Sequence, residues 1–250
     1  MKKFLSLVLI CVQLLYVSNK VEAQISEGGS PPSFEYTNLL KSELSPVEIP
    51  INFSVEDLKI VDAWKVNQGA PLKVATLIKA NLNPDNSGEW FTLPNNEMIW
   101  QLRIQAKGAI ALMLYYNDFF IPEGGKLFIY NIDRTQVLGA YTSKTNPPTK
   151  KFATEFVSGD DIILEYAVSP NGEKPRIEIE NIGYGYNHLY VRNNLKNTGP
   201  GTSGSCMVNI NCEEGDAWQN EKKGVCQMSQ KIGKSTYICS GSLINNTAED

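Results

Sequence analysis

From Pro71 onward the chain is divided into short stretches in which apolar and polar residues alternate, each closed by a turn-forming cluster. Examples are "MIWQLRIQA", followed by "KG", and "DIILEYAV", followed by "SPNGEKP". Alternation with a period of two is typical of strands, and Gly, Pro, Asn and Asp between them favour tight turns. About ten such runs reach as far as Tyr186, without the helices that a parallel sheet requires between strands. The pattern predicts an all-β fold, either an antiparallel β-sandwich or a related closed β-fold.

A single helix is expected ahead of these strands. In "FSVEDLKIVDAWKV" the hydroxyl of Ser54 can cap the first turn, with Asp57 three residues further on. Four apolar residues then follow roughly one helical face: Val55, Leu58, Val61 and Trp64. We expect this stripe to pack on a sheet.

Residues 1–23 have the three parts of a secretory signal peptide. Lys2 and Lys3 form the positive start, "FLSLVLICVQLLYV" is the apolar run, and "VEA" precedes the expected cleavage between Ala23 and Gln24. The apolar run is too short to span a bilayer, and no other run of that length follows. The sequence therefore predicts a secreted, periplasmic or cell-surface protein with no membrane segment after signal removal. An uncleaved N-terminal anchor is the alternative.

The charge of the chain indicates which partners to expect, and its composition divides it into segments. The net charge is −4 and the sequence has no basic stripe, so neither nucleic acid nor an anionic membrane is an expected partner. Residues 24–46 include "EGGSPPS" and have no apolar period, which predicts a flexible arm. Residues 47–190 hold the β-rich pattern and are long enough to bury a core of their own.

Four cysteines gather near the end of the sequence: Cys206, Cys212, Cys226 and Cys239. In an exported chain such clustering favours disulfide bonds, so these four are the disulfide candidates. A zinc site is the alternative, but the spacings include no C-x-x-C motif and the single histidine, His188, is not close by. We therefore expect no metal site and no cofactor.

Two further groups of residues have both a structural and a functional interpretation. Asp160 and Asp161 in "SGDDI" are expected in a solvated turn, with weak calcium binding as the alternative. Aromatic residues of the alternating strands are expected mostly in the core, with a sugar or peptide groove as the alternative. They are Trp90, Trp100, Tyr115, Tyr116, Phe119 and Phe120.

The C-terminal stretch resembles a known enzyme family. "GTSGSC" from Gly201, "CEEG" from Cys212 and "CSGSLINNTAED" from Cys239 are similar to the start of the mature domain of secreted bacterial lysyl endopeptidases, which are trypsin-like serine proteases with a two-barrel β-fold. Upstream, "QLRIQAKGAIALMLYYNDFFIPEGGKLFIYN" resembles the prodomain that precedes such domains. The resemblance implies that residues 47–190 are a prodomain and that residues 206–250 are the truncated start of a trypsin-like β-barrel.

Residues 191–205 would join these two parts. The stretch "VRNNLKNTGPGTSGSC" is polar, rich in Asn and Gly, and without an apolar period, as is typical of an exposed linker. By the resemblance the mature domain begins near Gly201, so propeptide processing is expected between Pro200 and Gly201. An ordinary interdomain linker is the alternative.

The catalytic residues of this family have no counterpart in the sequence. The mechanism uses a serine nucleophile, a histidine base and an aspartate. By the resemblance, the histidine lies in an Ala-His-His-Cys-like segment and the serine in a Gly-x-Ser-Gly segment, both beyond Asp250. His188 precedes the resembling stretch, and Ser203 matches the family's N-terminal segment instead of its nucleophile. We assign no catalytic residue and expect these residues alone to hydrolyse nothing.

The resemblance also bears on the cysteines. It implies that Cys206, Cys212 and Cys239 each pair with a cysteine beyond Asp250, and it gives Cys226 no counterpart. Pairing of the four among themselves, which has three arrangements, stays open.

The resemblance therefore predicts that the chain is the N-terminal portion of a secreted serine endopeptidase precursor. Cleavage after lysine is a weaker implication of the same resemblance. A protein or peptide substrate is expected only where the complete protease domain exists. The alternative comes from a different class. It is a stand-alone exported β-sandwich that binds a ligand, or a prodomain remnant that inhibits or chaperones a protease.

Overall fold

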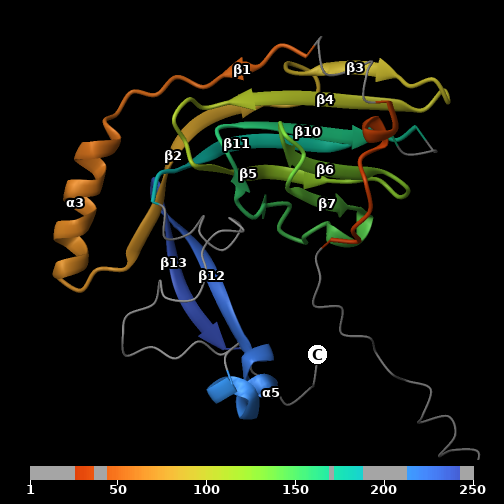
Figure 1. Ribbon diagram of the computed structural model, residues 1–250. Coiled ribbons are helices and arrows are strands. Elements are labelled where there is room, and N and C mark those ends of the chain that lie inside the picture. Colours follow the sequence, from red (N-terminus) through yellow and green to blue (C-terminus); the bar gives the residue numbers. More distant parts are fainter. Residues whose placement is uncertain (1–25, 37–43, 169–171, 188–212, 243–250) are drawn as a thin grey trace, which may run out of the picture. The chain divides into compact units, whose positions relative to one another are not determined.

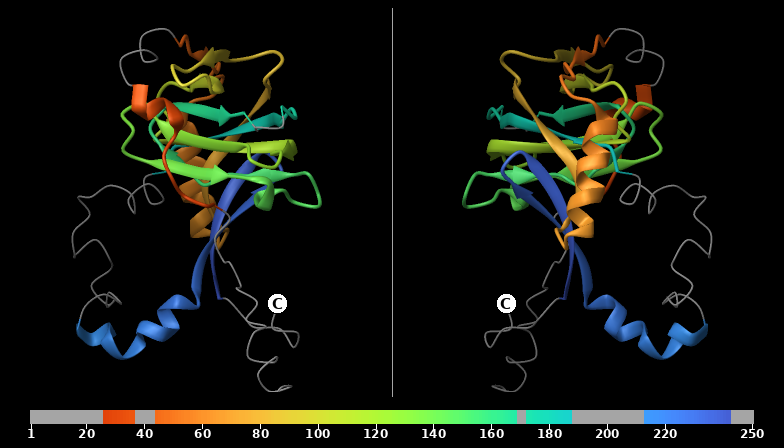
Figure 2. Two further views of the ribbon diagram at one scale, coloured as in Figure 1. Left: turned by 90° about the vertical axis from the view of Figure 1, so that its right-hand side faces the viewer. Right: turned by 90° about the vertical axis from the view of Figure 1, so that its left-hand side faces the viewer.

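Two β-sheets and few helices make up the described part of the chain, which comprises residues 26–36, 44–168, 172–187 and 213–242 of a computed structural model. The two layers can be followed in Figure 1, and Figure 2 shows them from two further sides. Among the described residues the strand pairs are antiparallel, except that β1 and β4 run parallel. The prediction of an all-β, sandwich-like fold is thereby confirmed.

Sheet A has the strand order β1-β4-β10-β6-β7, and β3 pairs with β4 outside this path. Its strands are β1 (Val47–Glu48), β3 (Glu89–Thr92), β4 (Met98–Gln105), β6 (Lys126–Asn131), β7 (Val137–Tyr141) and β10 (Asp161–Ala167).

Sheet B has the order β12-β13-β2-β11-β5-β8, and β9 pairs with β5 outside this path. Its strands are β2 (Leu72–Leu82), β5 (Ala111–Phe120), β8 (Phe152–Ala153), β9 (Val157–Ser158), β11 (Arg176–Gly185), β12 (Val225–Ile232) and β13 (Ser235–Ser242).

The helical elements are short. They are the α-helices α3 (Val55–Asn67) and α5 (Gln219–Lys223), and the 3₁₀ helices η1 (Pro32–Tyr36), η2 (Ser143–Thr145) and η3 (Glu213–Trp218). None of the helices in the described ranges has the length and apolar character needed to cross a bilayer.

One apolar core fills the space between the sheets. Because successive side chains of a strand point to opposite faces, every second residue enters this core. From sheet A these include Trp100, Leu102, Ile104, Ile162, Leu164 and Tyr166. From sheet B they include Leu112, Leu114, Tyr116, Ile177, Ile179 and Ile182. Fully burying one such side chain stabilises the fold by roughly 1.5–3 kcal/mol, so this core holds the two sheets together.

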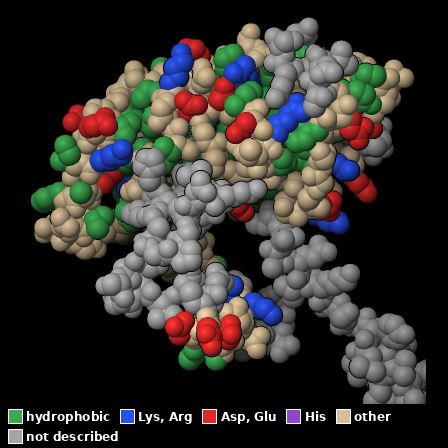
Figure 3. Space-filling view, in the orientation of Figure 1, with side chains coloured by type: hydrophobic (Ala, Val, Ile, Leu, Met, Phe, Trp, Pro, Cys, Tyr) green, Lys and Arg blue, Asp and Glu red, His purple; other side chains and the backbone are tan. Residues whose placement is uncertain are grey.

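Helix α3 begins where the sequence predicts. The Ser54 hydroxyl accepts a hydrogen bond from a first-turn backbone N–H at 3.2 Å, which caps the helix. Val55 and Leu58 pack against the core, as expected. Val61 and Trp64, however, are 46% and 64% exposed, so the second half of the predicted stripe does not pack on a sheet. Figure 3 shows hydrophobic side chains at the surface over this helix.

The position of Asp62 accounts for this difference. Its side chain is buried, and its carboxylate accepts a hydrogen bond from the hydroxyl of Tyr186. A buried carboxylate requires such a donor, and the contact turns the Asp62 side of α3 inward. The neighbouring positions 61 and 64 then face outward.

The core interpretation of the aromatic residues is confirmed for four of them: Trp100, Tyr115, Tyr116 and Phe119. Phe120 is partly exposed, and the guanidinium of Arg176 lies 4.4 Å from its ring centroid. Trp90 is 44% exposed and lines a surface hollow.

Residues 26–36 differ from the expectation of a flexible arm over residues 24–46. They pack against sheet A, where Ser33 is fully buried and its backbone N–H donates to the Glu165 carboxylate at 2.9 Å. The composition of "EGGSPPS" gives no sign of this contact, because its partner lies 132 residues further along the chain.

Several sequence predictions lie outside the described residues. These are the signal peptide with its cleavage between Ala23 and Gln24, the linker with the processing position Pro200–Gly201, and the residues His188, Ser203, Cys206 and Cys212. They stay predictions.

Buried tyrosines make the fold sensitive to alkaline pH. Burial raises the pKa of Tyr116, Tyr130 and Tyr141 above the ordinary value of 10.0. Because each pKa is higher in the folded chain than in the unfolded chain, the neutral buried hydroxyls contribute their full stability below pH 10.0. This contribution to the free energy of unfolding is lost as the pH rises above that value. We therefore expect these three hydroxyls to ionise only as the chain unfolds. Tyrosinate absorbance and far-ultraviolet circular dichroism should then share their last alkaline transition. Complete ionisation of the tyrosines while the dichroism stays native would contradict this.

Candidate functional site

The last described segment, Glu213–Ser242, forms a β-hairpin preceded by η3 and α5. β12 and β13 pair from Val225 opposite Ser242 to Ile232 opposite Ser235. The two-residue turn begins at Gly233, which has a φ of +58°. Two-residue hairpin turns require a positive φ at this position, and glycine adopts it without steric cost.

The hairpin is attached to the sandwich through β2. β13 pairs with β2 in the antiparallel direction, with Ser235 opposite Thr76 and Ile238 opposite Leu72. The backbone N–H of Leu77 also donates to the carbonyl of the turn residue at position 234, at 2.9 Å. Since β2 pairs on its other side with β11, the hairpin continues sheet B. This is the way an added segment extends the exposed edge of a sheet.

A buried polar contact fixes the hairpin. The hydroxyls of Thr236 and Tyr115 lie 2.7 Å apart, and Thr236 is fully buried. This bond links β13 to β5, which are not neighbours in the sheet. Beside this bond, Lys231 Nζ pairs with the Glu180 carboxylate at 3.2 Å. The same Nζ lies 5.1 Å from the centroid of the Tyr115 ring.

Gly183 lies beside Met113 and the Tyr115 ring. A Cβ at this position would lie 3.2 Å from the Cβ of Met113 and 3.4 Å from the Tyr115 ring. The ring belongs to a second apolar cluster, which also contains Val74, Ala75, Ala111, Met113 and Phe156. Ile238 of the hairpin packs against this cluster, so the attachment has an apolar as well as a polar part.

A hollow of about 220 Å³ lies where α3, the start of β2 and the hairpin meet. Its lining includes Asp62, Lys65, Lys73, Ile232 and Tyr237. Partial burial lowers the pKa of Lys73, and the carboxylate of Asp62 opposes this effect. The volume is below the ~300–1,000 Å³ of typical small-molecule sites, so we regard the hollow as part of the hairpin attachment.

The outer strand of the hairpin is exposed. β12 ends the order of sheet B, and large apolar side chains of this segment face solvent. They are Trp218, Val225, Met228 and Ile232, each at least 39% exposed. An edge strand with exposed apolar residues is a surface onto which further strands can pair.

The two described cysteines lie on this hairpin. Cys226 is opposite Gly241 and Cys239 is opposite Met228, so the two cysteines do not face each other. Within the described residues neither is bonded to another cysteine, and pairing with Cys206, with Cys212 or with a cysteine beyond Asp250 stays a prediction. A disulfide between these two candidates is therefore not formed.

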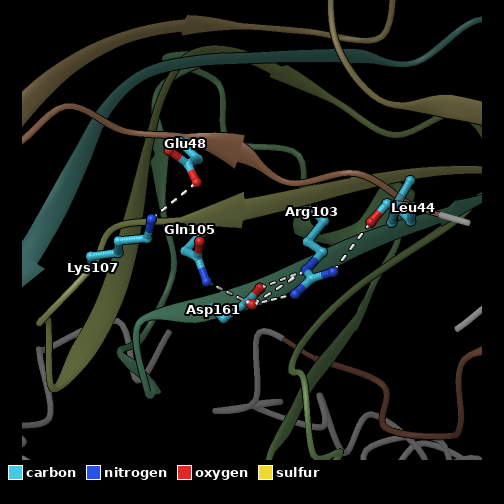
Figure 4. Close-up of polar contacts among 6 residues, drawn as sticks. All are labelled: Leu44, Glu48, Arg103, Gln105, Lys107 and Asp161. Atoms are coloured by element: carbon cyan, nitrogen blue, oxygen red, sulfur yellow. Dashed lines mark hydrogen bonds and ion pairs between the residues drawn. The ribbon is translucent and has the colours of Figure 1, made fainter. Parts of the chain in front are cut away.

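The acidic pair divides: Asp160 lies in a half-exposed bend, in line with the expected solvated turn, whereas Asp161 is buried at the start of β10. Asp161 is buried, and Arg103 donates to it from Nη2 at 2.7 Å and from Nε at 3.0 Å, as Figure 4 shows. This hydrogen bonding raises the pKa of Arg103. The Asp160 carboxylate accepts the backbone N–H of Gly108 at 3.0 Å. Within the described ranges, no three His, Cys, Asp or Glu side chains are arranged to hold a metal ion.

Arg103 also holds the chain that precedes β1. Its Nη1 donates to the carbonyl of Leu44 at 3.3 Å, and Lys107 pairs with Glu48 at 3.1 Å (Figure 4). The Arg103–Asp161 pair therefore links β4, β10 and the chain that leads into β1.

The hairpin lies within a stretch that a comparison with known families identifies as related to serine proteases. Residues 200–250 match the family described as "Lysyl endopeptidase, C-terminal domain". The resemblance drawn from the motifs at Gly201, Cys212 and Cys239 is thereby supported, and this stretch is lysyl endopeptidase-like. The resemblance of the upstream strands to a prodomain stays a prediction.

Sequence reasoning missed the residues that attach the hairpin. The sequence predicts Tyr115 in a core, and it is buried in the second apolar cluster, but its hydroxyl bond to Thr236 spans 121 residues. The one local sign of the hairpin is the sequence "KIGKST", in which Gly233 stands between two β-type runs.

We predict that Thr236→Val loosens the hairpin, because it leaves the buried Tyr115 hydroxyl without this partner. Losing a partner in a buried hydrogen bond costs about 1–3 kcal/mol. Hydrogen exchange of the β13 amides that pair with β2 should become faster. Ser229→Ala, at an exposed position of the same hairpin, is the matched control and should leave exchange unchanged. Equal exchange in both variants would show that the bond does not hold the hairpin.

Proposed function

We propose that the chain is the N-terminal part of a secreted serine endopeptidase precursor that cleaves after lysine. In this proposal residues 47–190 form the prodomain and residues 206–250 begin the protease domain. The observation that carries it is the position of the β12–β13 hairpin. This hairpin lies within the lysyl endopeptidase-like stretch and is hydrogen-bonded into sheet B of the sandwich.

The attachment suggests what the sandwich does for the protease domain. A hairpin by itself is marginally stable in water, since three or more strands or a packed face are needed for stability. β2 supplies a third strand, and the Tyr115–Thr236 bond fixes where the hairpin sits on it. The sandwich would thus hold the first hairpin in place while the rest of the protease domain folds onto it.

The exposed edge of β12 fits this role. Its apolar residues Val225, Met228 and Ile232 face solvent, and in a complete precursor they would be covered by the following strands of the protease domain. Export is part of the same proposal. It rests on the predicted signal peptide and on the secreted members of the family that the sequence resembles.

The test is to read the coding sequence through and beyond the Asp250 codon and to express the whole frame. We expect the frame to continue into an Ala-His-His-Cys-like segment and a Gly-x-Ser-Gly segment. The exported product should hydrolyse a lysyl amide substrate, and a serine-directed inhibitor should abolish that activity. Residues 1–250 expressed alone are the matched control and should be inactive, because they lack these segments. A stop directly after Asp250, or a complete product without lysyl amidase activity, would refute the proposal.

A ligand-binding module is the second candidate, and one observation favours it. A surface hollow of about 580 Å³ is lined by Trp90, Met98, Tyr166, Lys174 and Arg176, among others. Its volume is in the range of small-molecule sites, and Trp90 and Met98 are both more than 40% exposed. If the frame stops after Asp250, saturable binding of an oligosaccharide or peptide that Trp90→Ala abolishes would support this function.

A further inference from the structure

The outer face of sheet A, which faces away from sheet B, contains a fully buried carboxylate. Glu165 of β10 is 0% exposed, and its neighbours Gln101 of β4 and Tyr130 of β6 are almost completely buried. The Gln101 amide and the Tyr130 hydroxyl each donate to Glu165 Oε2 at 2.8 Å. Three adjacent strands thus build a polar site beneath the surface.

Ser33 completes this site from the N-terminal segment. Its backbone N–H donates to Glu165 Oε1 at 2.9 Å, and its hydroxyl donates to Oε2. One serine therefore reaches both oxygens of one carboxylate. Hydrogen bonds to a charged group in a dry site are stronger than neutral ones, and a carboxylate without enough donors would be costly to bury.

Phe34 adds an apolar contact beside the carboxylate. Its ring meets the Tyr130 ring edge-on at a centroid distance of 4.9 Å, and the Arg134 guanidinium lies 4.4 Å from its centroid. Phe34 also packs against the small apolar cluster that covers this face of sheet A, which includes Leu44 and Ile163. The ring is therefore held by an aromatic, a cationic and an aliphatic neighbour.

The segment is also paired to the edge strand β7. The N–H of Glu27 donates to the carbonyl of Ala140 at 2.9 Å, and the N–H of Ala140 donates to the carbonyl of Gly28 at 3.0 Å. Lys144 pairs with the Glu27 carboxylate at 2.8 Å. Residues 27 and 28 thus add backbone bonds to an edge strand, and the 3₁₀ helix η1 that follows brings Ser33 into a specific side-chain contact. Pairing at a sheet edge combined with a specific side-chain contact is one way in which domains bind peptides.

We propose that this face of sheet A is a peptide-binding site that recognises a serine followed by an aromatic residue, and that residues 26–36 occupy it in cis. Glu165, Gln101 and Tyr130 recognise the serine, Tyr130 and Arg134 recognise the aromatic ring, and β7 pairs with the preceding backbone. The segment is the site's own ligand, so a peptide of the same sequence competes with it. The site lies on sheet A, and its existence does not depend on the protease function proposed above.

The first test uses the full chain with Ser33→Ala. The variant removes the hydroxyl bond to Glu165 and leaves the inter-sheet core untouched. Without the Ser33 hydroxyl bond, we expect the bond from the Ala140 N–H to the Gly28 carbonyl to open more often. Hydrogen exchange of the Ala140 amide should then become at least about tenfold faster, because losing a hydrogen bond to a charged group weakens the attachment by that factor or more. Ser30→Ala, at an exposed position of the same segment, is the matched control. The same exchange rate in both variants would overturn the proposal.

The second test measures binding in trans. A fluorescent peptide with the sequence of residues 26–36 should bind the full-length Ser33→Ala, Phe34→Ala chain saturably and one to one. The peptide should bind this variant at least about tenfold more tightly than it binds the unaltered chain, because residues 26–36 of the unaltered chain already fill the site. A peptide carrying Ser33→Ala should bind at least about tenfold more weakly, and one carrying Ser30→Ala should bind equally well. No binding by a variant with native circular dichroism, or equal binding of the two peptides, would refute the site.

Discussion

The apolar core between the two sheets determines how the rest of the molecule is arranged, because it uses only one face of each strand. Residues such as Leu102, Leu164 and Leu114 point inward. The alternate residues of the same strands therefore point outward, where Arg103, Glu165 and Tyr115 are found. Side chains on these outward faces contact other parts of the chain, and each sheet has a segment from elsewhere in the sequence attached to it in this way.

The two attachments follow the same physical logic. On sheet A a segment near the N-terminus adds backbone bonds to β7 and inserts Ser33 into the buried site around Glu165. On sheet B the hairpin adds backbone bonds to β2 and places Thr236 against Tyr115. In each case the backbone hydrogen bonds hold the segment at the sheet edge but would allow several registers. A buried polar contact selects one register, because a shift of the segment would leave buried polar groups without partners.

Much of the sandwich could be predicted from the sequence, because alternation and turn residues are local. Runs such as "MIWQLRIQA" and "DIILEYAV" became β4 and β10, and Ser54 caps α3. Polar contacts between distant residues could not be predicted. Nothing local in "EGGSPPS" indicates that Ser33 meets Glu165, and nothing in "SGDDI" indicates that Asp161 pairs with Arg103. Likewise Asp62 faces inward on α3 because Tyr186 lies there to donate to its carboxylate.

We have proposed that the sandwich holds the lysyl endopeptidase-like hairpin in place, and cutting the chain between the two tests this most directly. A specific protease site would be placed within residues 191–205, and the cut chain analysed by gel filtration and native mass spectrometry. The account predicts that the fragment containing Val225–Ser242 stays bound, so that the mass of the uncut chain is retained until denaturant is added. Separate elution of the two fragments under native conditions would contradict it.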